Sequence, residues 1–339
     1  MGVDNNHTAN GRDELLRISN LRTYFYTSDG VIPAVDGIDL VIQRGKTVGL
    51  VGESGCGKSV TALSIMQLVP PPGRILPGSR ILLEGVDLLS LRPEQMYDIR
   101  GARIAMIFQE PMTSLNPVFT VGDQIAEAIL THKRVGRGQA REETIELLRQ
   151  VGIPQPEQRY HAYPHELSGG MRQRVMIAMA LSCQPELIIA DEPTTALDVT
   201  IQAQILELLR SLAEKHSTAL LLITHDLGVI AEMAQEVAVM YAGKIVEQAD
   251  VVTLFREPKH PYTRGLLASI PLLTSDRSVP LTMIKGTVPN LARLPPGCRF
   301  APRCPHVMPI CREKEPELTS HGATRVACWL YEPAVVGGE

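Results

Sequence analysis

A glycine-rich segment near the beginning of the sequence has the residue types that bind a phosphate chain. The segment Gly52-Glu53-Ser54-Gly55-Cys56-Gly57-Lys58-Ser59 fits the pattern G-x-x-x-x-G-K-[ST]. Its glycines allow successive backbone N–H groups to turn toward an anion, and a helix that begins after them adds the partial positive charge of its N-terminus. Lys58 is then placed to reach the β- and γ-phosphate oxygens, and the Ser59 hydroxyl to bind a Mg²⁺ ion that bridges them. The segment predicts a nucleoside triphosphate site.

Cys56 within this segment has two interpretations. The N–H groups at a helix N-terminus lower the pKa of a nearby thiol, which would make Cys56 reactive. Alternatively, Cys56 is a small loop residue without chemistry of its own, and this is the interpretation that we prefer.

Two adjacent acidic residues follow an apolar run farther along the chain. Leu187–Ala190 is followed by Asp191 and Glu192, and an acid at the carboxyl end of a buried parallel strand points into the crevice where such sheets bind ligands. We expect Asp191 to hold the Mg²⁺ ion and Glu192 to polarise the water that attacks the γ-phosphate. A solvated turn is the alternative. Together with the glycine-rich segment, the acids predict a P-loop nucleotide hydrolase, which could still be a motor, a kinase or a transporter.

Short apolar runs alternate with helical stretches from Leu21 to about residue 250, and both must position these side chains. The runs typical of buried parallel strands are Lys46–Val51, Arg103–Phe108, Leu187–Ala190 and Ala219–Thr224. The helical patterns are Val60–Leu68, Tyr97–Arg100, Gln139–Gln150 and Met171–Leu181. These patterns predict an α/β fold with a largely parallel sheet, and an inserted α-helical subdomain at about residues 112–170, where no convincing strand occurs.

Prolines become frequent after Gly243, and this change predicts the division of the chain into domains. We expect a flexible N-terminal tail over residues 1–15, a nucleotide-binding domain over 16–250 and a C-terminal extension over 251–339. The extension contains a small irregular Cys-rich module at 298–328, in which regular backbone pairing is not expected.

Composition and charge exclude several classes of protein. The 339 residues are 44% hydrophobic and 21% charged, which is typical of about two soluble globular domains and excludes a collagen, a coiled coil and a disordered chain. The 33 Lys and Arg residues against 37 Asp and Glu residues leave a net charge of −4, so no basic excess attracts nucleic acid. With neither a secretory signal nor a run of about 18 apolar residues, we expect the chain in the cytosol.

A third motif selects a family. Leu167-Ser168-Gly169-Gly170-Met171-Arg172-Gln173-Arg174 resembles the LSGGQ signature of ATP-binding-cassette (ABC) ATPases, with Met171 in place of the usual Gln. Other matches follow in the order of that family: Gln109 resembles the Q-loop residue, Thr195-Ala196-Leu197-Asp198 the D-loop, and His225 the switch histidine. The fold that the resemblance implies is a P-loop ABC-type nucleotide-binding domain.

The resemblance also implies how the site is assembled. Each ATP would lie between loop 52–59 of one chain and Ser168, Gly169 and Gly170 of a partner in a head-to-tail dimer, because those three residues open a helix whose N-terminus can bind a γ-phosphate. His225 would contact the γ-phosphate, and Gln109 would bind the metal, sense the attacking water and face the membrane partner. For stacking on adenine we choose Phe25, with Tyr24 and Tyr26 as alternatives and strand core as a different role for any of them.

Four short segments make the resemblance more specific: the chain resembles the D-type ATPase subunit of bacterial dipeptide/oligopeptide importers. This resemblance extends from Leu21 to about Leu330. The segments that carry it are Glu110–Pro117, Tyr163–His165, Gly170–Ala180 and His260–Thr263. The resemblance implies a second, F-type ATPase, two permeases, an extracytoplasmic binding protein and a peripheral place on the cytoplasmic face of the inner membrane. Glutathione, nickel or a peptide-like antibiotic are alternative solutes. A soluble ABC ATPase of DNA repair or translation is the alternative of another class, although the chain shows one cassette and no long heptad run.

Four cysteines are concentrated in the C-terminal module. Cys298, Cys304, Cys311 and Cys328 have the spacing C-x5-C-x6-C-x16-C, which allows four thiolates to converge on a soft metal centre but does not identify the metal. The family resemblance implies a [4Fe–4S] cluster with a structural role, since so small a proline-rich module needs a staple. Zinc is one alternative, and unligated or disulfide-forming thiols are another.

Overall fold

The computed structural model describes residues 13–109, 114–195, 197–270 and 284–332. The chain divides into two compact units, each built from separate stretches of sequence. The first contains Met1–Leu16, Val41–Thr47 and Leu83–Ile223, and the second contains Arg17–Leu40, Val48–Leu82 and Thr224–Glu339. The predicted domain boundaries at residues 15 and 250 do not coincide with these units and stay a prediction. Strand β1 already begins at Glu14, inside the predicted N-terminal tail, of which residues 1–12 lie outside the description.

Three parallel strands form the centre of the first unit. β7 (Ile104–Ile107) pairs with β8 (Leu187–Asp191), and β8 pairs with β9 (Ala219–Thr224). Every residue of β8 and β9 is buried, which explains their continuous apolar sequences. These three strands match the predicted runs to within two residues at each end. Their parallel pairing brings the carboxyl ends of β7 and β8 to the same edge.

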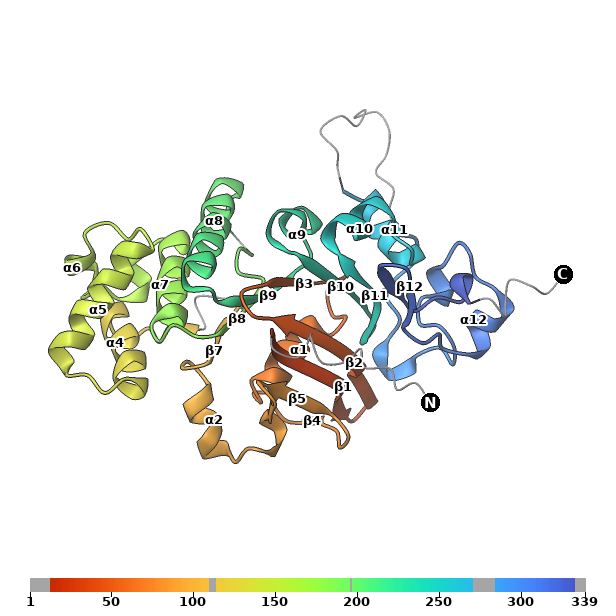
Figure 1. Cartoon of the computed structure of the whole chain (residues 1–339), viewed down its shortest axis with the longest axis horizontal. Helices are drawn as coiled ribbons and strands as arrows, with labels where there is room; N and C mark the ends of the chain where they lie inside the picture. Colours follow the sequence, from red (N-terminus) through yellow and green to blue (C-terminus); the bar gives the residue numbers. More distant parts are fainter. Residues whose placement is uncertain (1–12, 110–113, 196, 271–283, 333–339) are drawn as a thin grey trace, which may run out of the picture. The chain divides into compact units, whose positions relative to one another are not determined.

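Helices make up most of the remaining first unit (Figure 1). They are α2 (Pro93–Ile99), α4 (Val121–His132), α5 (Arg137–Gln150), α6 (Pro156–Arg159), α7 (Gly169–Leu181) and α8 (Val199–His216), with short 3₁₀ turns at Leu88–Ser90 and Pro164–Glu166 and a two-residue strand β6 (Val86–Asp87). Helices α4, α5 and α7 pack on one another through buried Ile125, Ile129 and Leu148. No strand occurs within residues 114–170, the described part of the expected helical insertion.

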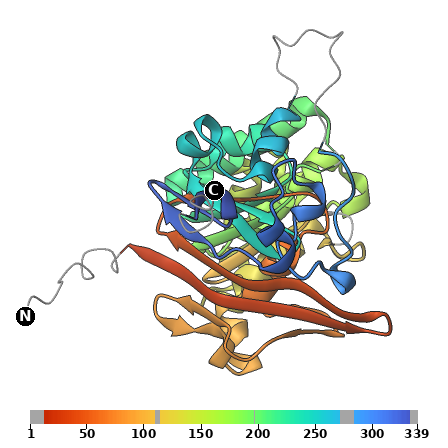
Figure 2. The ribbon, with the colours of Figure 1, turned by 90° about the vertical axis from the view of Figure 1, so that its right-hand side faces the viewer.

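A long hairpin, most of which belongs to the second unit, departs from the predicted parallel sheet. β1 (Glu14–Thr27) and β2 (Gly30–Gln43) are its strands, visible as the two long red arrows in Figure 2. β5 (Arg80–Leu83) lies beside β1, and β4 (Gly73–Ile75) pairs antiparallel with β1, with Phe25 opposite Gly73. The turn residues between β1 and β2 are the only local signal of this hairpin, and the alternating pattern of β1 was not distinguished from the α/β pattern.

A second set of strands in this unit includes part of the C-terminal extension. β3 (Thr47–Val51) runs parallel to β10 (Glu236–Tyr241), which pairs antiparallel with β11 (Lys244–Asp250). β13 (Thr324–Val326) pairs with β11, and β12 (Thr319–His321) with β13. The expectation that the Cys-rich module lacks regular backbone pairing is therefore wrong, because a hairpin of this module extends the sheet.

Short helices connect these strands. They are α1 (Lys58–Ile65), α9 (Leu227–Met233), α10 (Val251–Arg256), α11 (Pro261–Ala268) and α12 (Pro309–Glu313), with 3₁₀ turns at Leu291–Arg293, Ala301–Arg303 and Trp329–Tyr331. Among the described residues of both units, no helix combines the length and the apolar character that a membrane-spanning segment needs.

Candidate functional site

The glycine-rich loop connects β3 to α1 and is enclosed by its own unit. A Cβ atom on Gly52 would lie 2.1 Å from the carbonyl oxygen of Met240 in β10, and one on Gly57 would lie 2.1 Å from that of Ala34 in β2. Gly57 also has φ +112°, in the region that favours glycine. Larger residues cannot occupy these two positions without displacing neighbouring backbone. The loop is therefore held in one shape by β2 and β10, while Ser54 and Gly55 are exposed.

Lys58, the first residue of α1, points back into the loop. Its Nζ donates hydrogen bonds to the carbonyl oxygens of Gly52 at 2.8 Å and of Glu53 at 3.2 Å, and the residue is only 5% exposed. Ser59 follows it in the first turn of the helix. The loop thus places an ammonium group and the N-terminus of α1 side by side, as phosphate binding requires.

Cys56 is buried within the loop, and burial raises the pKa of its thiol although nearby Lys58 acts in the opposite direction. This is the reverse of the lowering that a helix N-terminus produces at an accessible thiol. The structure supports the interpretation of Cys56 as a small, unreactive loop residue.

In the first unit, the structure brings together the ends of β7 and β8. Gln109 follows β7, and its Nε2 donates to Glu192 Oε2 at 3.0 Å. Thr195 Oγ1 donates to the same oxygen at 2.9 Å. Glu192 itself has φ +46°, an unusual conformation for this residue type that clusters at functional sites. Asp191, the last residue of β8, is 4% exposed. The carboxylate of Glu192 is therefore oriented by two donors beside a buried acid.

The signature segment begins a helix in the same unit. Ser168 caps α7, because its hydroxyl accepts a hydrogen bond from the Met171 N–H at 3.3 Å. Gly169 and Gly170 form the first turn, and a Cβ atom on Gly170 would lie 2.8 Å from Cγ2 of Ile201 in α8. A larger residue at this position would have to displace the Ile201 side chain.

Asp198 of the predicted D-loop caps the next helix. Its Oδ1 accepts a hydrogen bond from the Ile201 N–H at the start of α8, at 3.0 Å. Two predicted segments fall partly outside the described residues, because the structure describes neither Ala196 of the D-loop nor residues 110–113 after Gln109.

The three candidate aromatic residues on β1 have different surroundings. Phe25 is half-buried against β4. Tyr24 donates a hydrogen bond to Asp36 Oδ1 at 2.5 Å, and burial together with that carboxylate raises its pKa to about 12. Tyr26 is 46% exposed, and the Arg74 guanidinium lies 6.0 Å from its ring centre. Of these three residues, only Tyr24 is shown with its hydroxyl group in a hydrogen bond to another side chain.

The predicted site residues are divided between the two units. Those in the first are Gln109, Ser168, Gly169, Gly170, Asp191, Glu192 and Asp198, and those in the second are Phe25, loop Gly52–Ser59 and His225. Within the first unit Gln109 and Glu192 are joined directly, and within the second unit Lys58 is joined to its loop.

The prediction of a [4Fe–4S] cluster is wrong. Among the described residues, no group of three or more His, Cys, Asp or Glu side chains is arranged to hold a metal ion. The cavity that Cys298, Cys304, Cys311 and Cys328 help to line has a volume of only about 10 Å³, room for about one water molecule. Burial raises the pKa of Cys298 to about 12 and of Cys328 to about 11. Zinc has no better support.

The module is instead held by packing and hydrogen bonds. The rings of Tyr241, Tyr262 and Phe300 lie with their centres 4.6–5.5 Å apart. The backbone N–H of Cys298 donates to the Cys311 carbonyl at 2.8 Å, and Trp329 Nε1 donates to the Lys314 carbonyl at 2.9 Å. These contacts remove the argument that the module needs a metal staple.

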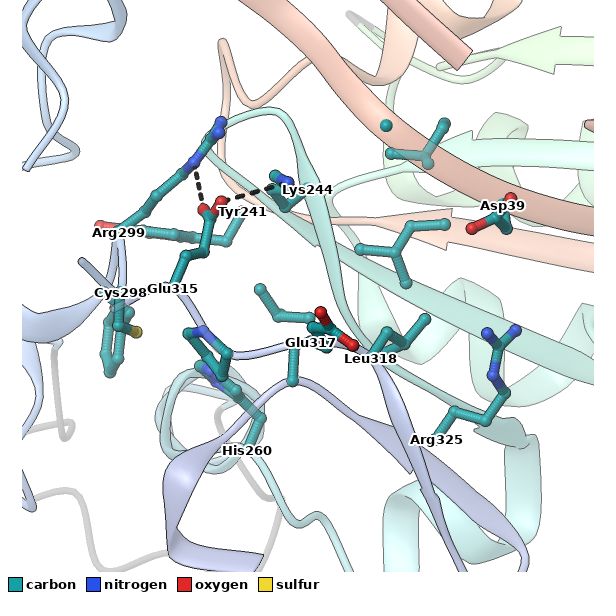
Figure 3. A pocket seen from close by; sticks show the side chains of 17 residues that line it. Asp39, Tyr241, Lys244, His260, Cys298, Arg299, Glu315, Glu317, Leu318 and Arg325 are labelled. Atoms are coloured by element: carbon teal, nitrogen blue, oxygen red, sulfur yellow. Dashed lines mark hydrogen bonds and ion pairs between the residues drawn. The ribbon is translucent and has the colours of Figure 1, made fainter. Parts of the chain in front are cut away.

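A larger cavity of about 470 Å³ lies in the second unit (Figure 3). Its charged lining side chains are those of Asp39, Lys244, Arg299, Glu315, Glu317 and Arg325. Lys244 and Arg299 both pair with Glu315, so these charges compensate one another, and we assign no ligand to this cavity.

Several contacts of the candidate site residues were not predicted. Glu53 occupies a position that the motif leaves open, and it contacts Arg303 and Tyr262 from the C-terminal extension. Nothing in the local sequence marks these contacts, because they join residues more than 200 positions apart. Thr195 lies within the predicted D-loop, but its hydrogen bond to Glu192 was not anticipated.

Two family models match the chain. The model described as ABC transporter matches residues 35–195, and the model described as oligopeptide/dipeptide transporter, C-terminal region, matches residues 246–311. The oligopeptide transport ATP-binding protein AppD of Bacillus subtilis (strain 168) is 57% identical over 320 residues, covering 94% of this chain and 97% of the relative. The dipeptide transport ATP-binding protein DppD of the same organism is 50% identical over 332 residues, covering 96% and 99%.

A solved structure is similar over most of its length. The ATP-binding cassette MJ0796, solved as a dimer in a post-hydrolysis state bound to ADP and Pi, superposes with a TM-score of 0.63 at 25% identity. The match covers 70% of this chain and 99% of that cassette.

Proposed function

The chain belongs to the ATP-binding subunits of oligopeptide and dipeptide ABC transporters and is an ATPase, and on that premise we propose which of its residues bind and hydrolyse MgATP to drive peptide import. The observation that carries the assignment is the orientation of Glu192 by Gln109 and Thr195 at the carboxyl ends of β7 and β8. In a family of ATP-hydrolysing proteins, such a fixed carboxylate is the candidate for the catalytic base.

Loop Gly52–Ser59 binds the phosphate chain in this proposal, and Phe25 stacks on the adenine. The oxygens of Ser59, Gln109 and Asp191 are hard ligands of the kind that Mg²⁺ takes. When bound, Mg²⁺ would neutralise charge on the β- and γ-phosphates. Lys58 reaches the oxygens of the β- and γ-phosphates. Glu192 accepts a proton from the attacking water, and His225 contacts the γ-phosphate.

The proposal places each ATP between two chains. Ser168, Gly169 and Gly170 begin α7, whose 13 residues give it an N-terminus able to bind the γ-phosphate of ATP held by a partner. The similar MJ0796 cassette was solved as a dimer, which supports an assembly of two chains. We propose an F-type ATPase as the partner, with Asp198 at the shared interface, and two permeases that hold the pair at the cytoplasmic face of the inner membrane and receive peptide from an extracytoplasmic binding protein.

The relatives favour peptide over the alternative solutes, and an importer over a soluble ATPase of DNA repair or translation. AppD and DppD are named for oligopeptide and dipeptide transport, and both are similar to nearly the whole chain. The C-terminal region that matches the oligopeptide/dipeptide family model gives independent support.

Replacing the proposed base tests the catalytic assignment. Glu192→Gln keeps the shape of the side chain and removes its capacity to accept a proton, so hydrolysis of MgATP by the assembled transporter should fall at least about a hundredfold while ATP binding is retained. Phosphate release and equilibrium nucleotide binding measure the two effects. Glu207→Gln, at an exposed glutamate of α8, is the matched control and should leave both unchanged. Full hydrolysis by the Glu192 variant would refute the assignment.

A further inference from the structure

The C-terminal extension contacts the phosphate-binding loop at Glu53. Arg303 Nη1 donates to Glu53 Oε2 at 2.6 Å, and Arg303 Nη2 donates to Glu53 Oε1 at 3.0 Å. Two parallel hydrogen bonds of this kind fix both the distance and the direction of a carboxylate. The Arg303 side chain is only 4% exposed and that of Glu53 is 28% exposed, so the pair is partly buried and salt screens it less than a surface pair.

The backbone of the same loop residue has a second contact with the extension. The Glu53 N–H donates to the hydroxyl oxygen of Tyr262, in α11, at 2.8 Å. Tyr262 is fully buried and packs against Tyr241 and Phe300, so the position of its hydroxyl group is fixed. Glu53 is therefore held at its side chain by one residue of the extension and at its backbone by another.

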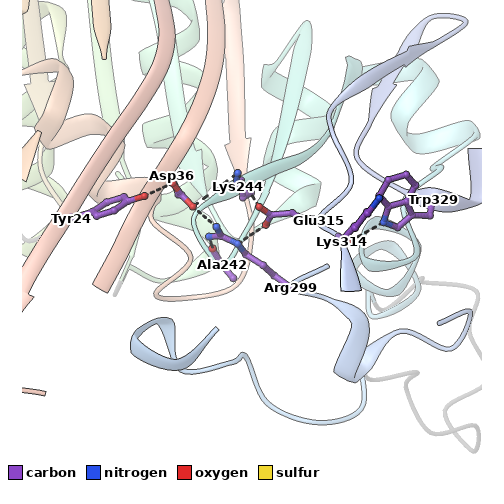
Figure 4. A network of polar contacts seen from close by, with 8 residues as sticks. All are labelled: Tyr24, Asp36, Ala242, Lys244, Arg299, Lys314, Glu315 and Trp329. Carbon is purple, nitrogen blue, oxygen red and sulfur yellow. Dashed lines mark hydrogen bonds and ion pairs between the residues drawn. The ribbon is translucent and has the colours of Figure 1, made fainter. Parts of the chain in front are cut away.

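Arg303 is itself fixed from several sides. Its Nε donates to the Lys285 carbonyl at 3.1 Å, and its guanidinium group lies 5.8 Å from the centre of the Tyr241 ring. Arg299, four residues earlier, anchors the same segment: it donates to the Ala242 carbonyl at 2.6 Å and pairs with Asp36 in β2 (Figure 4). The segment that carries Arg303 is thus attached to β2 and to the end of β10.

The contact continues from Glu53 to the phosphate-binding lysine. Lys58 Nζ donates to the carbonyl oxygen of Glu53 as well as to that of Gly52. A displacement of Glu53 therefore moves one of the two carbonyl groups that set the position of the ammonium group, and it also tilts the peptide that begins the loop. The route from the extension to the nucleotide runs through Arg303 or Tyr262, Glu53 and Lys58.

We propose that Arg303 and Tyr262 are positioning residues for nucleotide binding, through which the C-terminal extension sets the affinity of the loop for phosphate. This inference rests on the proposed function insofar as loop Gly52–Ser59 is the phosphate site. Neither residue touches the nucleotide in this proposal. Their role is to keep the loop in its binding conformation before the nucleotide arrives, which lowers the cost of ordering it.

Equilibrium binding of MgADP to the purified full-length chain tests the proposal without requiring hydrolysis or a partner. Arg303→Met, which keeps the length of the side chain, should weaken binding about tenfold, and Tyr262→Phe, which removes one oxygen atom, about threefold. Arg303→Lys, which restores one charged donor, should recover part of the loss. Arg312→Met is the matched control, because Arg312 is exposed in the same module, and it should bind as the unmodified chain does.

A double-substitution cycle separates positioning from general destabilisation. If Arg303 acts through Glu53, Arg303→Met should cause no further loss in a chain that already carries Glu53→Gln. Thermal unfolding of each variant shows whether it is folded, and Tyr262→Phe keeps the test decisive if Arg303→Met does not fold. Wild-type affinity in folded Arg303→Met and Tyr262→Phe chains, or an undiminished effect of Arg303→Met on the Glu53→Gln chain, would overturn the inference. Unchanged MgADP binding by Lys58→Ala would instead refute the assignment of the loop itself.

Discussion

At the scale of single residues, the chemistry depends on side chains whose orientation is set by a neighbour. Glu192 has a backbone conformation that is rare for glutamate, and Gln109 and Thr195 share one of its carboxylate oxygens. Lys58 is turned into its loop by two carbonyl groups. Such fixed polar groups reduce the reorganisation that has to accompany phosphoryl transfer.

If Phe25 stacks on the adenine ring, removal of its side-chain ring should weaken nucleotide binding. Base stacking on an aromatic ring contributes enough that Phe25→Ala should weaken MgADP binding about tenfold. Tyr26→Ala should have little effect, because Tyr26 is exposed and lies beside Arg74. Phe25→Tyr keeps a ring and should bind normally. Titration with a fluorescent adenine nucleotide measures all three, and a large loss for Tyr26→Ala with none for Phe25→Ala would transfer the role to Tyr26.

Among the helices and strands, the start of α11 should make the stability of the fold depend on pH. His260 caps this helix, because its Nδ1 accepts the Tyr262 N–H at 3.0 Å, and complete burial lowers its pKa to about 3, with repulsion from Arg264 as a smaller cause. The backbone N–H groups of Lys259 and His260 both donate to the buried carboxylate of Glu247, whose pKa burial raises. The helix that carries Tyr262 therefore begins at a neutral histidine.

This histidine should make the folded chain less stable in mild acid. The folded pKa of about 3 lies below the ordinary value of 6.5, so the unfolded chain binds a proton between these values and the folded chain does not. The contribution to stability is complete above pH 6.5 and falls as the pH decreases toward 3. Between pH 7.5 and 5.5 the loss from this residue should be about 1 kcal/mol.

Urea unfolding at the two pH values measures this loss. His260→Asn keeps a capping acceptor and does not titrate, so its loss of stability between pH 7.5 and 5.5 should be smaller by about that amount. An identical pH dependence in both chains would show that His260 does not stay neutral in the folded protein.

The elements differed in how far the sequence could predict them. β7, β8 and β9 are continuous apolar runs, which indicate strands buried on both faces. The P-loop and signature motifs predicted where α1 and α7 begin. The long β1–β2 hairpin was missed, since its residues alternate only in part and its sheet depends on β4 and β5 farther along the chain. The pairing of β13 with β11 joins residues 77 and more positions apart and has no local signal.

At the scale of the whole molecule, the motifs identified the family but not the contacts that support the site. Gln109, Asp191 and Glu192 were predicted by type and position, whereas Arg303 and Tyr262 became visible only when folding placed them beside Glu53. The cluster prediction failed because the cysteine spacing says which thiols could meet but not how much space lies between them. The extension is attached by buried arginines and aromatic rings instead.

In the proposed mechanism, ATP hydrolysis at Glu192 drives peptide uptake by the transporter that contains this chain. The most direct test is uptake of a labelled dipeptide or oligopeptide into cells in which the chromosomal gene is replaced by the wild-type, Glu192→Gln or Glu207→Gln form, with the amount of membrane-bound subunit measured in parallel. We expect normal uptake with the wild-type and Glu207→Gln chains, and uptake reduced to background with an equal amount of Glu192→Gln chain at the membrane. Uptake at the wild-type rate with the Glu192→Gln chain would contradict this mechanism.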